Sequence, residues 1–224
     1  MSSDGSRAMP DVIIKNLPFL LAGLRLTAEI SVLSIIGGSA LGVAIGIVRH
    51  VRVPALAQLF DVYVEFVRGT PLLVVLFICY FGFPALFGYQ TSAYSAAILG
   101  FILFIAAYLA EDIRSGLRSV RGSLVQAALA LGLTRAQVIC FVVIPIALRN
   151  VIPTLFNQYV RLFKFTSVAS VIGVNELTGS AMLINAREFA PFSIIAFLAL
   201  TYLVFCFAIS SLGRLIYSRL AIRA

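Results

Sequence analysis

Residues 126–134 read Gln-Ala-Ala-Leu-Ala-Leu-Gly-Leu-Thr, and they lie in a loop between hydrophobic runs long enough to cross a bilayer. The pattern predicts a short helix with a small, flat alanine face, and Gly132 predicts its end or a bend. Such a helix could lie on the lipid headgroups. Because alanine inserts weakly into lipid but fits a protein groove, we favour a surface that a separate protein grips from the aqueous side.

The composition is that of a membrane protein. The chain has 224 residues, of which 61% are hydrophobic and 12% charged, and its mean hydropathy is +1.06. A water-soluble domain could not bury so much apolar surface, so lipid must be the solvent of this chain. A spanning helix needs about 20 mainly apolar residues, and five stretches offer them: 19–47, 55–83, 93–113, 146–172 and 190–213. We therefore expect an all-α membrane protein with five transmembrane helices.

The basic residues predict the orientation of these spans. Nine of them follow the first, third or fifth span: Arg49, Arg52, Arg114, Arg118, Arg121, Arg135, Arg214, Arg219 and Arg223. The opposite flanks carry three, namely Arg7, Lys15 and Arg187. Since Lys and Arg concentrate in cytoplasmic loops, we expect the N-terminus outside and the C-terminus in the cytoplasm. Residues 1–18 have no short apolar core followed by a cleavage site, which favours an external or interfacial segment over a secretory signal.

Glycines recur every four residues in the first span, at Gly38, Gly42 and Gly46. Small residues at this spacing let a second helix approach closely in lipid, where packing drives association. We interpret the row as a packing face in preference to a ligand site.

Charged residues interrupt the second stretch. Asp61, Glu65 and Arg68 share one helix face, and Arg68-Gly-Thr-Pro71 breaks the helix, since proline removes a backbone donor. Charges at membrane depth need a partner or water. Two interpretations stay open: a Glu65–Arg68 ion pair that fixes the break, and a direct role of these residues in a solute path.

The fourth span carries a polar stripe. Its members recur at spacings of four, three, four and three, which places them on one helix face: Asn150, Thr154, Asn157, Arg161 and Lys164. The alternatives are a pathway and a ladder of interhelical hydrogen bonds. We favour the pathway because both cations lie on the stripe, where they would attract carboxylates. Beyond this span, we expect residues 174–186 to form an outer loop with Glu176 exposed.

Few residues of the chain are candidates for catalysis, metal binding or nucleotide binding. Thr134 and Gln137 predict a capping box at the start of a helix. His50 is the only histidine, and we interpret it as a solvated loop residue. The three cysteines have no CxxC spacing, so we expect small core residues and no metal site. Neither lysine stands in the Gly-Lys-Ser/Thr context of a phosphate-binding loop, so the chain cannot drive transport by its own ATP hydrolysis.

Four motifs, in order, carry a resemblance to a known family. They are Arg68-Gly-Thr-Pro-Leu-Leu73, Ala107-Tyr-Leu-Ala-Glu-Asp-Ile-Arg114, Gln126-Ala-Ala…Gly132 with Ile144-Pro145, and Thr166-Ser-Val-Ala-Ser-Val-Ile-Gly-Val-Asn-Glu-Leu177. Over about residues 15–220 the chain resembles the permease subunit of bacterial ATP-binding-cassette (ABC) importers, in the polar-amino-acid uptake group (histidine, glutamine, arginine and opine type).

The resemblance implies a type I ABC importer permease fold in one domain, residues 19–220, with a cytoplasmic coupling loop at 114–145. It implies that Gln126, Ala127, Ala128 and Gly132 dock into a cytoplasmic ABC ATPase dimer, which holds ATP and Mg; this chain itself would hold no cofactor. An external solute-binding protein and a second permease, the same or a sister chain, would complete the assembly in the bacterial inner membrane. The chain would be a non-catalytic subunit.

Two departures from the family pattern concern function. Gln126 replaces the usual Glu of the docking loop, which keeps length and hydrogen bonding but loses a charge. Phe165 stands where the family often has the Asp of Lys-Asp-Thr-Ser. That carboxylate could recognise an amino group, so either the solute is not a cationic amino acid or a second permease supplies the carboxylate. Our candidates for the solute path are Glu65, Arg68, Asn157, Arg161, Lys164 and Thr166.

Two other classes of protein remain as rivals. A secondary transporter or channel would need no ATPase and would leave the 126–134 segment unexplained. A non-transporting assembly or receptor subunit would tolerate leucine in place of the polar stripe.

Overall fold

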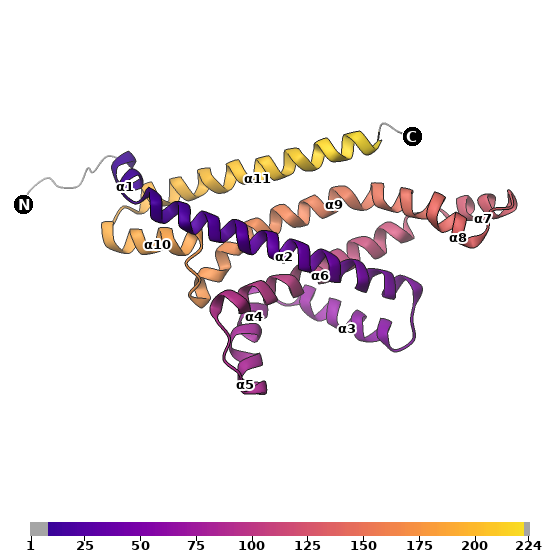
Figure 1. Cartoon of the computed structure of the whole chain (residues 1–224), viewed down its shortest axis with the longest axis horizontal. Coiled ribbons are helices and arrows are strands. Elements are labelled where there is room, and N and C mark those ends of the chain that lie inside the picture. The colour runs from indigo at the N-terminus through magenta and orange to yellow at the C-terminus, as the bar shows by residue number, and fades with distance from the viewer. Residues whose placement is uncertain (1–8, 222–224) are drawn as a thin grey trace, which may run out of the picture.

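The regular structure of the chain is helical throughout the part that the computed structural model describes, residues 9–221 (Figure 1). The α-helices are α1 (Met9–Lys15), α2 (Leu17–Val51), α3 (Leu56–Gly69), α4 (Leu72–Phe77), α5 (Phe83–Phe87), α6 (Ala93–Arg118), α7 (Gly122–Ala130), α8 (Arg135–Val138), α9 (Ile144–Phe165), α10 (Leu177–Glu188) and α11 (Pro191–Ala221). Two π-helices, Ile78–Gly82 and Ile139–Val143, and a 3-10 helix, Thr166–Ile172, join some of them.

Within residues 9–221, four helical segments are long and apolar enough to span a membrane: Leu17–Val51, Ala93–Arg118, Arg135–Ile172 and Pro191–Arg219. A fifth span results if the pair Leu56–Gly69 and Leu72–Phe87, bent by 115°, counts as one. The number of spans is therefore four or five, where the sequence predicted five, and several predicted spans were too short. Helices α2 and α6 continue past their apolar cores into turns that carry the basic residues Arg49 and Arg118.

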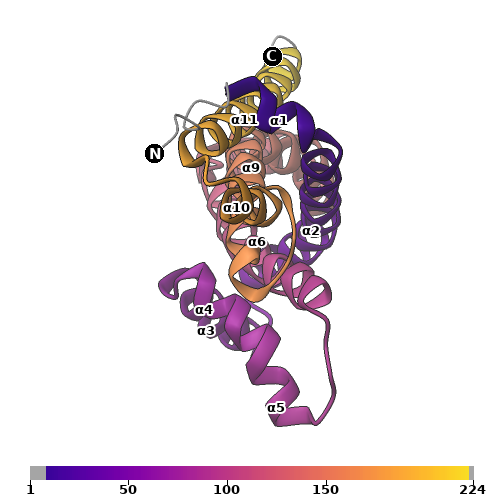
Figure 2. The same cartoon turned by 90° about the vertical axis from the view of Figure 1, so that its left-hand side faces the viewer.

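The bend in the second stretch lies where the sequence predicted a break. Thr70 is extended, with φ −104° and ψ 137°, and Pro71 caps α4. A residue before proline disfavours the α conformation, because the proline ring clashes with its backbone. Figure 2 shows the consequence: α5 projects away from the rest of the bundle, whereas α4 still packs on α6 and buries Leu72, Val75 and Leu76.

Helix α2 packs on α6 through the predicted glycine row. A Cβ atom added at Gly38 would lie 1.7 Å from Ile105 Cγ2, and one at Gly42 would lie 2.8 Å from Leu109 Cβ. Both facing side chains are fully buried, with 1% and 0% of their surface exposed. The packing-face interpretation is confirmed, because only glycine permits this separation between the two helices.

The fourth span begins earlier than Pro145. The chain is helical from Arg135, passes through the π-helix Ile139–Val143 and continues into α9 with Pro145 in its first turn. Proline supplies no N–H to this continuous helix, and it lies two residues after the π-helix, where the i→i−4 hydrogen-bond pattern is already interrupted. Helices thus extend into the predicted 114–145 loop from both sides.

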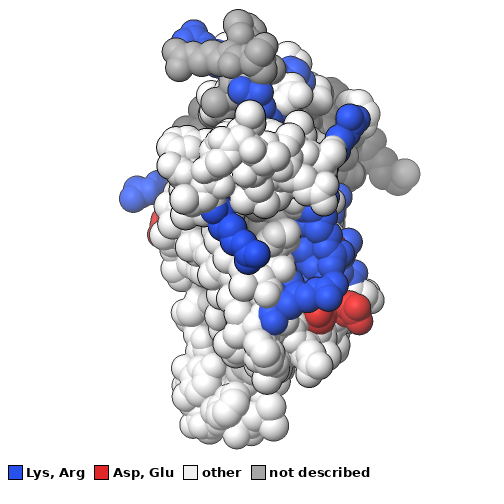
Figure 3. All heavy atoms as spheres, turned by 90° about the vertical axis from the view of Figure 1, so that its right-hand side faces the viewer, with Lys and Arg blue, Asp and Glu red and all other residues white. Residues whose placement is uncertain are grey.

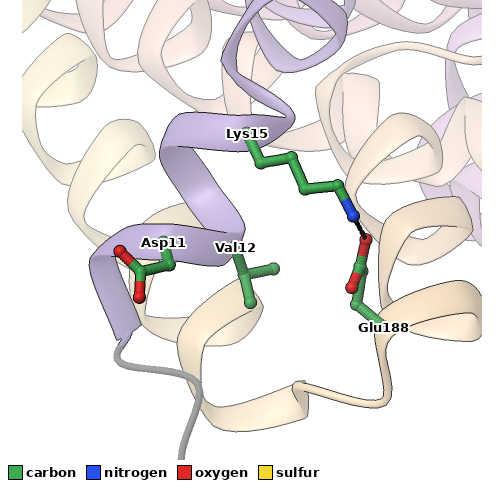
Figure 4. Close-up of a pocket in the computed structure, with 4 residues that line it drawn as sticks. All are labelled: Asp11, Val12, Lys15 and Glu188. Atoms are coloured by element: carbon green, nitrogen blue, oxygen red, sulfur yellow. Dashed lines mark hydrogen bonds and ion pairs between the residues drawn. The ribbon is translucent and has the colours of Figure 1, made fainter.

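The predicted outer loop at 174–186 was wrong, because Leu177–Glu188 forms α10. Figure 1 places α10 and α1 together at the end of the bundle opposite α7 and α8. Lys15 Nζ donates to Glu188 Oε1 over 2.8 Å, beside a cavity of about 450 Å³ that Asp11 and Val12 also line (Figure 4). This ion pair holds α1 against α10.

The sequence interpretation of the cysteines was correct only in part. Cys79 is buried, whereas Cys140 is exposed and Cys206 is half-buried. His50 is exposed as expected, but it lies in the last turn of α2 and not in a loop.

Candidate functional site

The turn from α7 to α8 is the first part of the candidate site. Gln126 and Ala127 are exposed, whereas Ala128 is only 7% exposed and packs against the chain itself. Leu131 ends the helix and is 82% exposed. Gly132 follows with φ +86°, a left-handed conformation that favours glycine.

Backbone hydrogen bonds fix this turn. The N–H of Gly132 donates to Leu129 O over 3.0 Å, and the N–H of Leu133 donates to Ala128 O over 3.2 Å. Thr134 and Gln137 then form the predicted capping box at the start of α8. The end of α7 therefore presents exposed small and apolar side chains on a rigid turn.

Basic side chains gather at this end of the molecule. Viewed from the side of α7 and α8, Lys and Arg form a broad patch with a small acidic group beside it (Figure 3). The same end in Figure 1 is the one toward which α11 runs. Arg7 and Arg223, which entered the prediction of orientation, lie outside the described residues.

A network of ion pairs joins α2, α3 and α6. The guanidinium of Arg49 donates from Nε to Asp61 Oδ1 over 2.7 Å and from Nη1 to Glu111 Oε2 over 2.9 Å. Arg114 Nη1 lies 3.3 Å from the same Asp61 oxygen. The side chain of Arg49 is only 3% exposed, so its charge is matched inside the protein as a buried charge requires.

Arg68 joins this network through α6. Its Nη1 lies 3.8 Å from Glu111 Oε2, so the Glu65–Arg68 ion pair offered by the sequence is replaced by one between α3 and α6. Glu65 is exposed and makes no ion pair or hydrogen bond with the described residues.

The Tyr108 ring of α6 contacts a cationic side chain from α3 and another from α9. The guanidinium carbons of Arg68 and Arg161 lie 5.6 Å and 5.2 Å from the centre of the Tyr108 ring. Both distances fall in the range of cation–π attraction. One turn further along α6, Asp112 Oδ2 accepts a hydrogen bond from Gln158 Nε2 over 3.0 Å. Two of the predicted path residues, Arg68 and Arg161, are thereby brought to one place.

The polar stripe of α9 does not face a single surface. Asn150 Nδ2 donates to Ser119 Oγ over 2.7 Å, which is an interhelical bond, and Thr154 bonds within its own helix. Asn157 lines a cavity of about 190 Å³ between α9 and α11. Of the two cations, Arg161 lies over Tyr108, and both it and Lys164 are exposed.

Thr166 does not line a surface of this chain. It is fully buried, and its hydroxyl donates to Phe163 O over 2.8 Å. The prediction that its hydroxyl faces a solute path is corrected, because the 3-10 helix that follows α9 turns this side chain inward.

Sequence reasoning missed Glu176, which is fully buried and not exposed. It caps α10: Thr178 N donates to Oε2 over 3.0 Å and Gly179 N to Oε1 over 2.9 Å. The hydroxyls of Thr27 and Tyr202 each lie 3.2 Å from Oε2. Burial raises the pKa of the Glu176 carboxyl, although these four donors favour its ionised form. One carboxylate thus ties α2, α10 and α11 together.

Sequence reasoning also missed the roles of Arg49 and Asp112. In the sequence, Arg49 appeared to be a flanking cation that marks the cytoplasmic side, and Asp112 appeared only as part of the motif Ala107–Arg114. The available signal was the presence of Asp61 and Glu111-Asp112 inside apolar stretches, since carboxylates there require partners.

Comparison with known proteins gives one family. Residues 38–222 match the model of the family described as "Binding-protein-dependent transport system inner membrane component". Among curated relatives, the probable amino-acid ABC transporter permease protein PatM of Vibrio harveyi is 35% identical over 85% of this chain and 86% of its own. The glutamine transport system permease protein GlnP of Escherichia coli (strain K12) is 34% identical over 92% of this chain and 94% of its own.

Solved structures agree with the sequence relatives. An amino acid ABC transporter, crystallised with histidines, contains a chain with a TM-score of 0.88 and 30% identity, covering 98% of this chain and 100% of that one. A chain of the MetNI methionine ABC transporter, in an inward-facing conformation, has a TM-score of 0.75 over 91% of this chain and 97% of its own, at 18% identity. The second likeness concerns the fold alone.

Proposed function

Since this chain belongs to the family of binding-protein-dependent transport system inner membrane components, we propose that it forms half of the translocation pathway of an ATP-driven importer for a polar amino acid or related small solute. The observation that carries the proposal is the family match over residues 38–222. The relatives named for amino-acid and glutamine transport support the class of solute.

The exposed turn after α7 is the proposed contact with a cytoplasmic ABC ATPase dimer. Gln126, Ala127 and Gly132 present a small surface, and Ala128 holds the turn from inside. Gln126 supplies hydrogen-bonding groups without a charge. ATP and Mg would be held by the ATPase, and the permease would move as its partner closes.

The proposed orientation places the α7 end in the cytoplasm of a bacterial cell and α1 with α10 outside the inner membrane. The basic patch at the α7 end supports this assignment, because cytoplasmic flanks are rich in Lys and Arg. An extracytoplasmic solute-binding protein would then deliver the solute to the opposite end, where α1 and α10 lie. The permease domain is residues 19–220, and residues 114–145 form its cytoplasmic coupling region.

The proposed solute path involves Glu65, Arg68, Asn157, Arg161 and Lys164. All five are exposed in the single chain. Glu65, Arg161 and Lys164 make no ion pair within residues 9–221. Since such a charge at membrane depth requires water or a partner, the five residues suit a wet path between this chain and a second permease, identical or related. Arg161 and Lys164 would attract the carboxylate of an amino acid.

The test is purification of the tagged chain from its native membrane in mild detergent, with mass spectrometry of its partners and uptake in vesicles. We expect a stoichiometric ATPase, and uptake that requires ATP. A chain that is recovered alone and moves solute on an ion gradient without ATP would replace the proposal with a secondary transporter.

A variant pair tests the docking turn. Gly132→Arg places a bulky cation on the exposed turn and should abolish recovery of the ATPase. Gly88→Arg is the matched control, because Gly88 has a similar backbone, φ +70°, and equally open surroundings, but lies at the end of α5. Equal loss of the ATPase from both variants would assign the effect to backbone strain instead of docking.

A further inference from the structure

An apolar groove of about 400 Å³ lies between α2, α6 and the first half of the fourth span. Every side chain of its wall except one is apolar: Val43, Ile47, Val51, Ile113, Leu117, Ile139, Val143, Ile144, Ala147, Leu148, Val151 and Leu155, with His50 as the exception. The groove belongs neither to the charged network nor to the docking turn.

The groove has a buried floor and open walls. Ala147 and Val151 are 4% and 5% exposed, whereas Ile47, Leu148 and Ile139 are each about half exposed, at 48%, 51% and 52%. An open apolar groove on a spanning segment is favourable only when another apolar group fills it.

Cations follow two residues of the groove wall along the chain, where α2 and α6 end. Arg52 directly follows the wall residue Val51, and Arg118 directly follows Leu117. Both arginines are exposed, and neither makes an ion pair with a carboxylate of residues 9–221. No acidic residue lines the groove.

We propose that this groove binds an acyl chain of an anionic phospholipid, whose phosphate lies against Arg52 and Arg118. An apolar slot with uncompensated cations at its mouth complements a molecule with an apolar tail and an anionic head. The inference goes beyond the transport function, and it requires only that α2 and the fourth span lie in a bilayer. Because Arg52 and Arg118 lie where α2 and α6 end, the bound lipid would belong to the leaflet on the α7 side.

The chain contains no tryptophan, so the difference in fluorescence between the complex with an introduced tryptophan and the complex without it reports on the introduced position. Val43→Trp sets an indole at the wall residue of α2 farthest along the helix from Arg52, at a side chain already 43% exposed. The transporter complex with and without this substitution is placed in phosphatidylcholine vesicles. These contain increasing mole fractions of either tail-brominated phosphatidylglycerol or tail-brominated phosphatidylcholine, and bromine quenches the indole on contact.

We expect brominated phosphatidylglycerol to quench the indole at position 43 at a concentration about fivefold or more below that of brominated phosphatidylcholine, since each cation near an anionic lipid contributes about that factor. The preference should disappear in Arg52→Gln/Arg118→Gln. A control indole, Val204→Trp on the exposed face of α11, should show no preference.

Equal quenching of the indole at position 43 by the two lipids would overturn the proposal, and so would an equal preference at positions 43 and 204. Quenching at position 43 by neither lipid would also overturn it, since a protein, such as a second copy of the chain, would then cover the groove. If the preference for phosphatidylglycerol persists in Arg52→Gln/Arg118→Gln, the two arginines do not bind the phosphate, and the proposal is wrong.

Discussion

Arg49 and Asp61 form an ion pair of 2.7 Å in which the guanidinium side chain is 3% exposed and the carboxylate side chain 39% exposed. The pair closes the connection between α2 and α3, and Glu111 extends it to α6. A buried cation needs this arrangement, because removing one partner leaves the other charges unmatched.

Replacement of Arg49 by Met should therefore destabilise the fold. We expect a loss of about 2–3 kcal/mol, below the usual cost for a fully buried pair because Asp61 is partly solvated. For a chain of this size the unfolding midpoint in detergent should fall by about 5–10 °C.

The neighbouring cation provides the control for Arg49. Arg52→Gln removes an exposed charge without an ion pair among the described residues, and its unfolding midpoint should stay unchanged. Equal stability of the Arg49→Met and Arg52→Gln proteins would show that the network contributes nothing to stability.

Gly38 tests the contact between α2 and α6. The added methyl group of Gly38→Ala would lie 1.7 Å from Ile105 Cγ2, so the helices must separate. We expect a cost of about 1–3 kcal/mol, the usual range for overpacking, measured as a lower unfolding midpoint. Gly69→Ala is the matched control, because its Cβ meets no atom within 4 Å. If both variants unfold alike, close helix packing is not the reason for glycine at position 38.

Glu176 should make stability depend on pH. Burial raises the pKa of its carboxyl above the ordinary value of 4.5, so the folded chain binds this proton more readily than the unfolded chain. The stability that the protonated Glu176 carboxyl contributes is fully present below pH 4.5, and it declines as pH rises through the raised pKa. In Glu176→Gln, which imitates the protonated form, that decline should be absent. Unfolding midpoints measured across this window check the sign, and parallel profiles of the two proteins would contradict it.

Arg161 and Lys164 test the solute path. Each replacement by Gln removes a charged donor, which is worth about 1.5–3 kcal/mol when it binds an anion. We expect the KM for uptake to rise about tenfold or more for each variant, with recovery of the ATPase unchanged. Arg149→Gln, on the same helix but off the stripe, is the control. Uptake that is unaffected in the Arg161→Gln/Lys164→Gln protein would remove both residues from the path.

Local patterns predicted the parts of the fold that depend on neighbouring residues. The capping box of Thr134 and the left-handed Gly132 are of this kind, as is the break before Pro71. The glycine row of α2 was also predictable, because its spacing alone marks a contact face. Helix ends were harder to predict, because hydropathy shows where an apolar stretch ends and not where the helix ends. Helix α6, for example, continues past its apolar stretch to Arg118.

The contacts that organise the candidate site could not be predicted in the same way. The two partners of Arg49 lie 12 and 62 positions away in the sequence, and Thr27 lies 149 positions from Glu176. Glu176 looked like an exposed loop residue because its own neighbours form no periodic pattern. Only the fold supplies the donors that offset part of the cost of burying its carboxylate.

The length of α2 has a mechanical consequence. Its 35 residues extend about 52 Å, well beyond the roughly 30 Å of a hydrocarbon core. Thr27, toward the N-terminal end of α2, donates a hydrogen bond to Glu176, and Arg49, near the C-terminal end, donates one to Asp61. Each end of the helix is therefore tied to a neighbouring segment and does not turn independently of it. A helix held in this way behaves as a lever: a tilt of about 5° around one end displaces the other by about 4–5 Å. A small rotation near α10 would therefore become a side-chain-sized displacement where α3 begins.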